Sequence, residues 1–194
     1  RGVDESAGAV YVYGYNASSV NFEARLQASD RASFDVFGSA LALSGASLVV
    51  GAKGKDNNTG AVYNFLRGAT WFEQSRLRKS NLQAGDQFGS AVALLGNVAL
   101  IGAPMARVGA CCEQGAGSIF VRTASSWRGV LDLRASDAQG FDRLGSSAAL
   151  SDAGPVLGAP DSNDPVTARD ATGSAVVFAG GLVLFVDGFE AEAN

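Results

Sequence analysis

The stretch Phe37-Gly-Ser-Ala-Leu-Ala-Leu-Ser-Gly-Ala-Ser-Leu-Val-Val-Gly-Ala-Lys53 decides the fold, because it recurs twice further along the chain. The second copy is Phe88-Gly-Ser-Ala-Val-Ala-Leu-Leu-Gly-Asn-Val-Ala-Leu-Ile-Gly-Ala-Pro104. The third and more degenerate copy is Leu144-Gly-Ser-Ser-Ala-Ala-Leu-Ser-Asp-Ala-Gly-Pro-Val-Leu-Gly-Ala-Pro160. The three copies align without a gap and begin 51 and then 56 residues apart. Self-similarity at such a period indicates a repeat array.

A second unit lies between these copies and begins with glycine. It reads Gly8-Ala-Val-Tyr-Val-Tyr13, Gly60-Ala-Val-Tyr-Asn-Phe65, Gly117-Ser-Ile-Phe-Val-Arg122 and Gly173-Ser-Ala-Val-Val-Phe178. Each repeat therefore divides into two hairpins, with strands expected over 38–43, 48–52, 61–65 and 71–77 in the first. Runs of this length, bounded by glycine, are typical of short antiparallel strands.

Four short strands in each repeat of roughly 50 residues are typical of a propeller blade. We predict an all-β fold of propeller-type blades, each of four antiparallel strands, with about three and a half repeats and no closed propeller. The predicted single array spans 1–194, with an orphan hairpin at 8–27, blades at about 37–78, 88–134 and 144–187, and a tail at 188–194. The apolar register predicts a buried core that includes Val49, Val50, Val62, Leu100, Ile101 and Ile119.

The Phe-Gly and Gly-Ala-Pro elements, followed by Gly-Ala-Val-Tyr and a strand containing tryptophan, resemble the FG-GAP repeat. That family forms the propeller heads of integrin α subunits and many bacterial surface proteins, so the resemblance implies an extracellular, adhesive role. Copy three departs from the pattern at Leu144, and Pro155 falls within a strand, which favours a terminal, edge-exposed blade. The calcium loop of integrin-type repeats is absent, because 44–47 and 95–97 lack the oxygen ligands for a hard cation. The resemblance therefore implies the short, metal-free bacterial variant.

Acidic residues recur at equal distances before each Phe-Gly or Leu-Gly pair. Paired carboxylates could serve acid–base chemistry or a cation, but a residue repeated in every blade favours a structural role in a turn. The members of this set are Asp30, Asp35, Asn81, Asp86, Asp137 and Asp142. The acidic loop containing Asp161, Asn163 and Asp164, and the stretch 55–58, are weak candidates for calcium against the simpler interpretation of a solvated turn. We expect folding to need no metal or other cofactor.

Composition argues against catalysis, because the chain contains no histidine, the commonest general base. Ser39, Ser90 and Ser146 therefore cannot belong to a Ser-His-Asp triad, and no motif points to a Ser-Lys pair. The repeat-matched Trp71 and Trp127 favour packing over a sugar platform. The adjacent Cys111 and Cys112 leave a vicinal disulfide, free thiols and bonds to other chains as alternatives. We predict no catalytic and no cofactor-binding residue.

Charge and hydropathy limit the partners. The net charge is −4 without a basic stripe, so we expect no nucleic-acid partner. No apolar run reaches the roughly 18 residues of a membrane helix. The ending Leu184-Phe-Val-Asp-Gly-Phe-Glu-Ala-Glu-Ala-Asn194 resembles that of many exported bacterial proteins. We therefore expect an extracellular or cell-surface location.

Hairpin counting leads to the functional hypothesis. There are three hairpins of the Phe-Gly type and four of the Gly-Ala-Val-Tyr type, so one hairpin of the second type is left over. Open blade faces and strand edges favour association, which predicts self-assembly into an oligomer or filament, or truncation from a longer propeller. We expect an exported, non-enzymatic structural or adhesive surface protein whose partners are copies of itself, a surface protein or a glycan. The alternative is an accessory propeller fragment of a larger secreted enzyme or adhesin with its other domains upstream.

Overall fold

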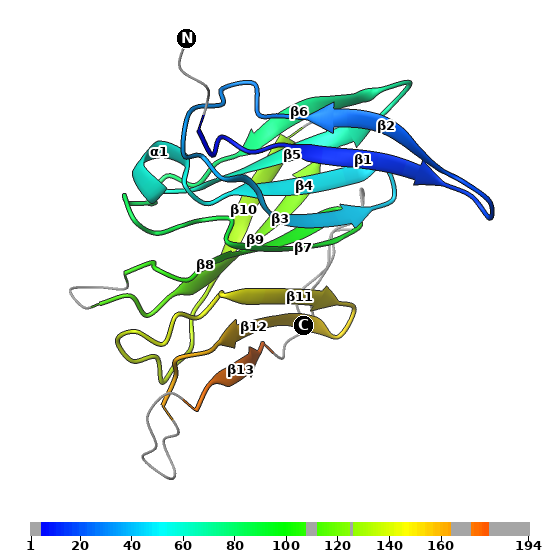
Figure 1. Cartoon of the computed structure of the whole chain (residues 1–194). Coiled ribbons are helices and arrows are strands. Elements are labelled where there is room, and N and C mark those ends of the chain that lie inside the picture. The colour runs from blue at the N-terminus through cyan, green and yellow to red at the C-terminus, as the bar shows by residue number, and fades with distance from the viewer. Residues whose placement is uncertain (1–4, 108–111, 125, 164–171, 179–194) are drawn as a thin grey trace.

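The computed structural model describes residues 5–107, 112–124, 126–163 and 172–178, and these form strands joined by short loops (Figure 1). A single helical turn, α1 (Lys55–Asn58), connects two of the strands in this part of the chain. The strands are β1 (Val10–Tyr15), β2 (Val20–Leu26), β3 (Phe37–Ser44), β4 (Ser47–Ala52), β5 (Ala61–Arg67), β6 (Trp71–Leu77), β7 (Ala91–Leu95), β8 (Val98–Ala103), β9 (Ala116–Thr123), β10 (Ser126–Leu133), β11 (Ser147–Ser151), β12 (Gly154–Ala159) and β13 (Ser174–Val177).

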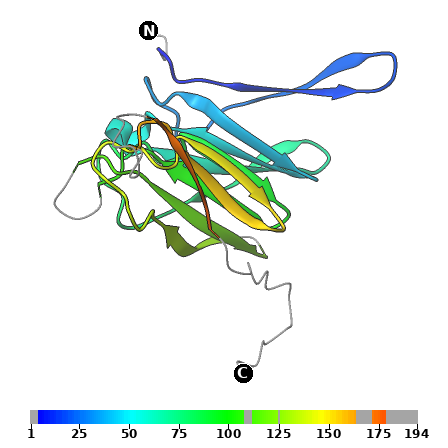
Figure 2. The ribbon, with the colours of Figure 1, turned by 90° about the horizontal axis from the view of Figure 1, so that it is seen from below.

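The strands make four antiparallel sheets that follow the chain order. The sheets are β1-β2, β3-β4-β5-β6, β7-β8-β9-β10 and β11-β12-β13. They are stacked face against face, and the β1-β2 hairpin stands on one outer side of the stack (Figures 1 and 2). Over the described residues, these sheets do not close into a ring. The predicted fold class, blades of four antiparallel strands without closure, is therefore confirmed.

Successive sheets approach most closely where the repeats carry glycine. A Cβ atom added to Gly51 of β4 would collide with the carbonyl oxygen of Gly89, and one added to Gly102 of β8 would collide with that of Gly145. Both contacts join the Gly-Ala end of one repeat to the Phe-Gly or Leu-Gly start of the next. The small residues of the motif are thus explained by a close backbone approach between blades.

Three apolar clusters fill the spaces between successive sheets. Phe37 lies in the first cluster, Phe88 in the second and Leu144 in the third, and all three side chains are buried. Strands β4 and β8 are buried over their whole length because neighbouring sheets cover both of their faces. The predicted core residues Val49, Val50, Val62, Leu100, Ile101 and Ile119 are all buried, as expected.

The second unit of the middle repeat begins at Gly115, so its predicted start at Gly117 is wrong. Gly115 bridges Leu144 in the way that Gly60 bridges Phe88, and Ala116 pairs with Ala103 as Ala61 pairs with Ala52. Gly115 also has φ +79°, close to the +88° of Gly60, and a side chain there would collide with the Leu144 backbone. Glycines at both 115 and 117 allow two alignments, and only backbone geometry distinguishes them.

Pro155 lies in the central strand of its three-stranded sheet. It is the second residue of β12, and the pairing of β12 with β13 begins only at Val156. Beyond that pairing, the Pro155 carbonyl accepts a hydrogen bond from the Phe178 backbone N–H at 3.1 Å. The strand therefore tolerates proline through its position near the strand start rather than through an exposed edge.

We expect Leu100→Ala to lower the free energy of unfolding by about 2–5 kcal/mol, because it leaves a cavity between the third and fourth sheets. Urea unfolding monitored by tryptophan fluorescence measures this change. Leu43→Ala is the matched control: Leu43 is exposed, so its truncation should cost less than about 0.5 kcal/mol. A loss of only a few tenths of a kcal/mol at Leu100 would contradict the packing.

Candidate functional site

The loop ahead of the first strand of each blade (β3, β7 and β11, the inner strands) is held by one buried carboxylate. The side chains of Asp35, Asp86 and Asp142 each accept a hydrogen bond from the backbone N–H three residues earlier, at 2.7, 2.8 and 2.6 Å. The residue after each of these aspartates has a positive φ of about 55° (Val36, Gln87 and Arg143). This conformation is unfavourable for a side chain, above all for a β-branched one. The aspartates thus close the turn that introduces each inner strand.

Asp30 has partners on other elements. Its carboxylate accepts a hydrogen bond from the Tyr63 hydroxyl at 2.7 Å and forms an ion pair with Arg76 at 3.2 Å. The buried ammonium of Lys55 lies 3.0 Å from Asp35 and 3.6 Å from Asp30, and it also donates to the Asp30 backbone carbonyl. This network joins the loop before β3 to α1, β5 and β6, so it stabilises the first repeat.

The network keeps the Asp30 carboxylate ionised. Burial works to raise the pKa of Asp30, but the Tyr63 hydrogen bond and the charges of Lys55 and Arg76 outweigh it and lower that pKa below the ordinary 3.8. Burial and the neighbouring Asp30 carboxylate raise the pKa of Tyr63. Asp30 is therefore a carboxylate and Tyr63 a neutral phenol at neutral pH, and neither group is poised to transfer a proton there.

We expect Lys55→Ala to destabilise the fold by about 3–5 kcal/mol, because it leaves the buried Asp35 carboxylate without its charged partner. Thermal and urea unfolding measure the loss. Lys53→Ala, two residues earlier at an exposed position, is the control and should change stability by less than about 0.5 kcal/mol. Equal stability of the two variants would show that the buried ion pair does not support the fold.

The next repeat replaces this network with a cavity. Ser118 occupies in β9 the position of Tyr63 in β5, because Ser118 pairs with Ile101 as Tyr63 pairs with Val50. The smaller side chain leaves a cavity of about 480 Å³ beside the β9-β10 hairpin. The cavity wall includes Lys79, Ser118, Phe120, Leu131 and Asp132.

Ser118, Lys79 and Asp132 contact one another in this cavity. The Lys79 ammonium donates to Ser118 Oγ at 2.8 Å and to Asp132 Oδ1 at 2.7 Å, and Ser118 Oγ lies 3.0 Å from the same carboxylate oxygen. Burial would raise the pKa of Asp132, but the hydrogen bond and charge of Lys79 lower it. Asp132 is therefore ionised and forms an ion pair with Lys79 at 2.7 Å, so the three side chains make one hydrogen-bonded cluster in the cavity wall.

The serines of the Phe-Gly motif bind backbone atoms. Ser90 Oγ donates to the Gln87 carbonyl and Ser146 Oγ to the Arg143 carbonyl, both at 2.8 Å. Ser39 Oγ accepts from the Lys53 backbone N–H at 3.3 Å and approaches the Gly89 carbonyl at 3.4 Å. These three hydroxyls therefore tie loops to strands.

Two of the residues predicted as weak calcium ligands form ion pairs with arginine instead. Asp161 forms an ion pair with Arg143 at 3.0 Å, and Asp56 of the 55–58 stretch forms one with Arg76 at 2.6 Å. Asn163 and Asp137 both line a cavity next to β13, and Asp164 lies outside the described residues. Within the described ranges, no three His, Cys, Asp or Glu side chains are grouped so that they could hold a metal ion.

We expect calcium removal to leave the fold unchanged, because Asp161 and Asp56 are neutralised by arginine rather than by a cation. Thermal melts with excess chelator and with added calcium should give the same Tm within about 1 °C, since binding a native-state ligand would raise it. Arg143→Ala removes the ion-pair partner of Asp161, and the same melts on this variant serve as the comparison. A chelator-induced drop of several degrees would contradict this interpretation and direct attention to the loop that begins at Asp161.

The cysteines and tryptophans lie in different settings. Cys112 is half-buried in the loop before β9, and Cys111 lies outside the described residues. Trp71 packs against the first apolar cluster and donates to Glu23 at 3.4 Å, while Trp127 packs against the second and stacks with Arg122. Both tryptophans pack between sheets, as their repeat positions predict.

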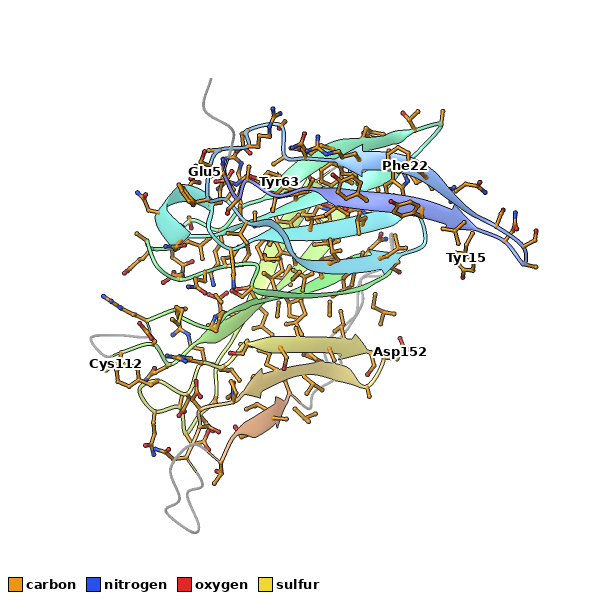
Figure 3. All side chains as sticks on the ribbon, viewed as in Figure 1. Glu5, Tyr15, Phe22, Tyr63, Cys112 and Asp152 are labelled. Carbon is orange, nitrogen blue, oxygen red and sulfur yellow. The ribbon has the colours of Figure 1, made fainter. Side chains whose placement is uncertain are left out.

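The β1-β2 hairpin carries an exposed aromatic face that was not predicted from the repeat pattern. Tyr11, Tyr13, Tyr15 and Phe22 are exposed on this hairpin, and Tyr13 contacts Phe22 edge to face with ring centroids 5.8 Å apart. The cross-strand pairs Tyr11–Arg25 and Tyr13–Phe22 place these side chains on one side. Figure 3 shows Tyr15 near the projecting tip of the hairpin and Phe22 on β2, closer to the other strands. Alternating tyrosines at 11, 13 and 15 were the available signal, because alternation places them on one face.

The part of the chain that the structure describes has no helix long and apolar enough to cross a membrane.

Stacked antiparallel blades, joined by Gly-to-Gly contacts, define a propeller-type repeat protein. The family model described as FG-GAP repeat matches residues 20–65 and 71–121, which together make up half of the chain. The chain belongs to the FG-GAP repeat family. A search of curated proteins finds no match.

Proposed function

We propose that this chain is a non-enzymatic assembly and adhesion scaffold at the outside of the cell, which associates with other copies of itself through the aromatic face of β1-β2. Membership of a repeat family whose blades bury their faces against one another supports this role. Repeat arrays of this kind need their terminal faces covered, because each unit buries its apolar side only against a neighbour.

One comparison within the chain carries the proposal. Tyr11 and Tyr13 are 55% and 54% exposed, whereas Tyr63 and Phe65, at the same positions of the next repeat, are 1% and 3% exposed. The later pair is buried because the β1-β2 hairpin covers it. Aromatic side chains that are buried between blades in one repeat and exposed in another fit an interface with a further molecule.

The absence of poised catalytic groups among the described side chains supports a scaffold rather than an enzyme. Lys79 and Asp132 neutralise each other, and Asp30 is held by Lys55 and Arg76. Charges paired in this way stabilise sheets instead of transferring protons. The exported location rests on the resemblance of residues 184–194 to the endings of exported proteins, and these residues lie outside the described ones.

A surface protein or a glycan is the second class of partner for the same face. Exposed tyrosine rings stack on apolar surfaces of many kinds, and Arg25 beside Tyr11 offers hydrogen bonds. A second copy is favoured, because Tyr11 and Tyr13 stand at the positions of Tyr63 and Phe65, which this chain buries between its own sheets.

Light scattering on the purified chain at micromolar concentration tests this proposal. We expect a mass above that of the 19.8 kDa monomer. The double variant Tyr11→Ser with Tyr13→Ser should shift the mass toward that of the monomer. Val130→Ser, at a similarly exposed position of β10, is the control and should leave the mass unchanged. A stable, compact monomer of the natural sequence would overturn self-association.

A further inference from the structure

A four-stranded blade consists of an inner hairpin, such as β3-β4, and an outer hairpin, such as β5-β6. The β1-β2 sheet corresponds to the outer hairpin alone. Gly8 forms a parallel bridge to Phe37, as Gly60 does to Phe88, so β1 is the counterpart of β5 and β2 that of β6. Strand β5 pairs with β6 on one side and with β4 on the other. Among the described residues, β1 pairs with β2 alone. The position that β4 occupies beside β5 is therefore open beside β1.

Backbone glycines show the same open position. A Cβ atom added to Gly89 would lie closest to the Ala61 carbonyl oxygen, Val62 Cγ2 and the Cα of Gly51. Gly38, its counterpart in the first repeat, is near the Ala9 carbonyl and Val10 Cγ2, which are the equivalents of the first two neighbours. The third neighbour, a glycine Cα like that of Gly51 in β4, has no counterpart among the three nearest atoms at Gly38.

The face of β3 beside this position is apolar and exposed. Leu41 and Leu43 are 51% and 63% exposed, while Val92, the counterpart of Leu41 in β7, is 9% exposed. Val92 is buried because Ala40, Ala42 and Val49 of the preceding inner hairpin pack in the same cluster. The side chains that would cover Leu41 and Leu43 are thus those of an inner hairpin.

The chemistry of the missing hairpin follows from the equivalents that the chain already contains. Its first strand needs small residues after an apolar-glycine pair, and its second needs an aliphatic run ending in Gly-Ala, as in the fully buried β4 and β8. Such a strand would add to the free edge of β1 by backbone hydrogen bonds. A second copy has none to donate from its described residues, because β4, β8 and β12 are already paired with β5, β9 and β13.

We propose that the free edge of β1, with Leu41 and Leu43, is an acceptor site for one β-hairpin of the Phe-Gly/Gly-Ala type, supplied by a polypeptide segment outside residues 1–194. This inference rests on the proposed scaffold function and names a second kind of contact. The aromatic face associates with another copy, and the β1 edge takes a hairpin that completes a four-stranded blade.

A grafted hairpin tests the acceptor site directly. A second copy of residues 28–57 is placed before Ser6, in place of residues 1–5, because Ser6 is the structural counterpart of Asn58: their carbonyls accept from Val36 and Gln87. We expect amide exchange in β1 to slow at least tenfold, on the order expected when an edge strand becomes a central one. The Tm should also rise by several degrees. Particle size on the same samples reports self-association separately, so failure of one proposal is distinguishable from failure of the other.

Two matched variants decide whether the graft acts as a blade hairpin. Val49→Asp with Val50→Asp in the grafted hairpin should abolish the slowing, because that strand is buried on both faces. Leu41→Asp with Leu43→Asp in the host should reduce it by a similar factor, while Val130→Asp should leave it intact. Unchanged β1 exchange in the grafted chain, or equal slowing by the aspartate-bearing graft, would overturn the proposal.

Discussion

The contact between glycine backbones of successive sheets is the constraint on which the rest of the structure depends. Gly51 faces Gly89 and Gly102 faces Gly145, each at a distance that leaves no room for a Cβ atom. Such a contact fixes both the separation and the orientation of two sheets, because backbone atoms cannot move aside as side chains do. The apolar clusters around Phe37, Phe88 and Leu144 then fill the space that this separation creates.

Most of the fold could be predicted from the sequence, because the repeat places small and aliphatic residues in the same order three times. Strand positions such as 71–77 and buried residues such as Val49 follow from that order. The start of the second unit in the middle repeat did not follow, because Gly115-Ala-Gly117 offers two equivalent glycines. Only a backbone bridge to Leu144 distinguishes them, and such a bridge joins residues distant in sequence.

The candidate sites were less predictable, since they depend on which repeats face one another. The spacing of Asp35, Asp86 and Asp142 indicated a local role in turns, and each binds a nearby backbone N–H. The same spacing could not indicate that Asp30 binds Tyr63 and Arg76 from other strands. Likewise, the cavity at Ser118 could not be predicted from the sequence. It is recognised only when β9 is superimposed on β5, because its wall is built from residues of the 78–81 loop and of β9-β10 together.

The linear stack of sheets has a consequence for how the molecule loses its structure. When each sheet contacts only its neighbours, stability is a sum of the internal stability of each sheet and one term for each interface. The β1-β2 hairpin has two strands and a single interface, so its opening costs less free energy than that of the central sheets, which have four strands and two interfaces. Unfolding under native conditions should therefore begin as fraying at this end, with the two central four-stranded sheets the last to open.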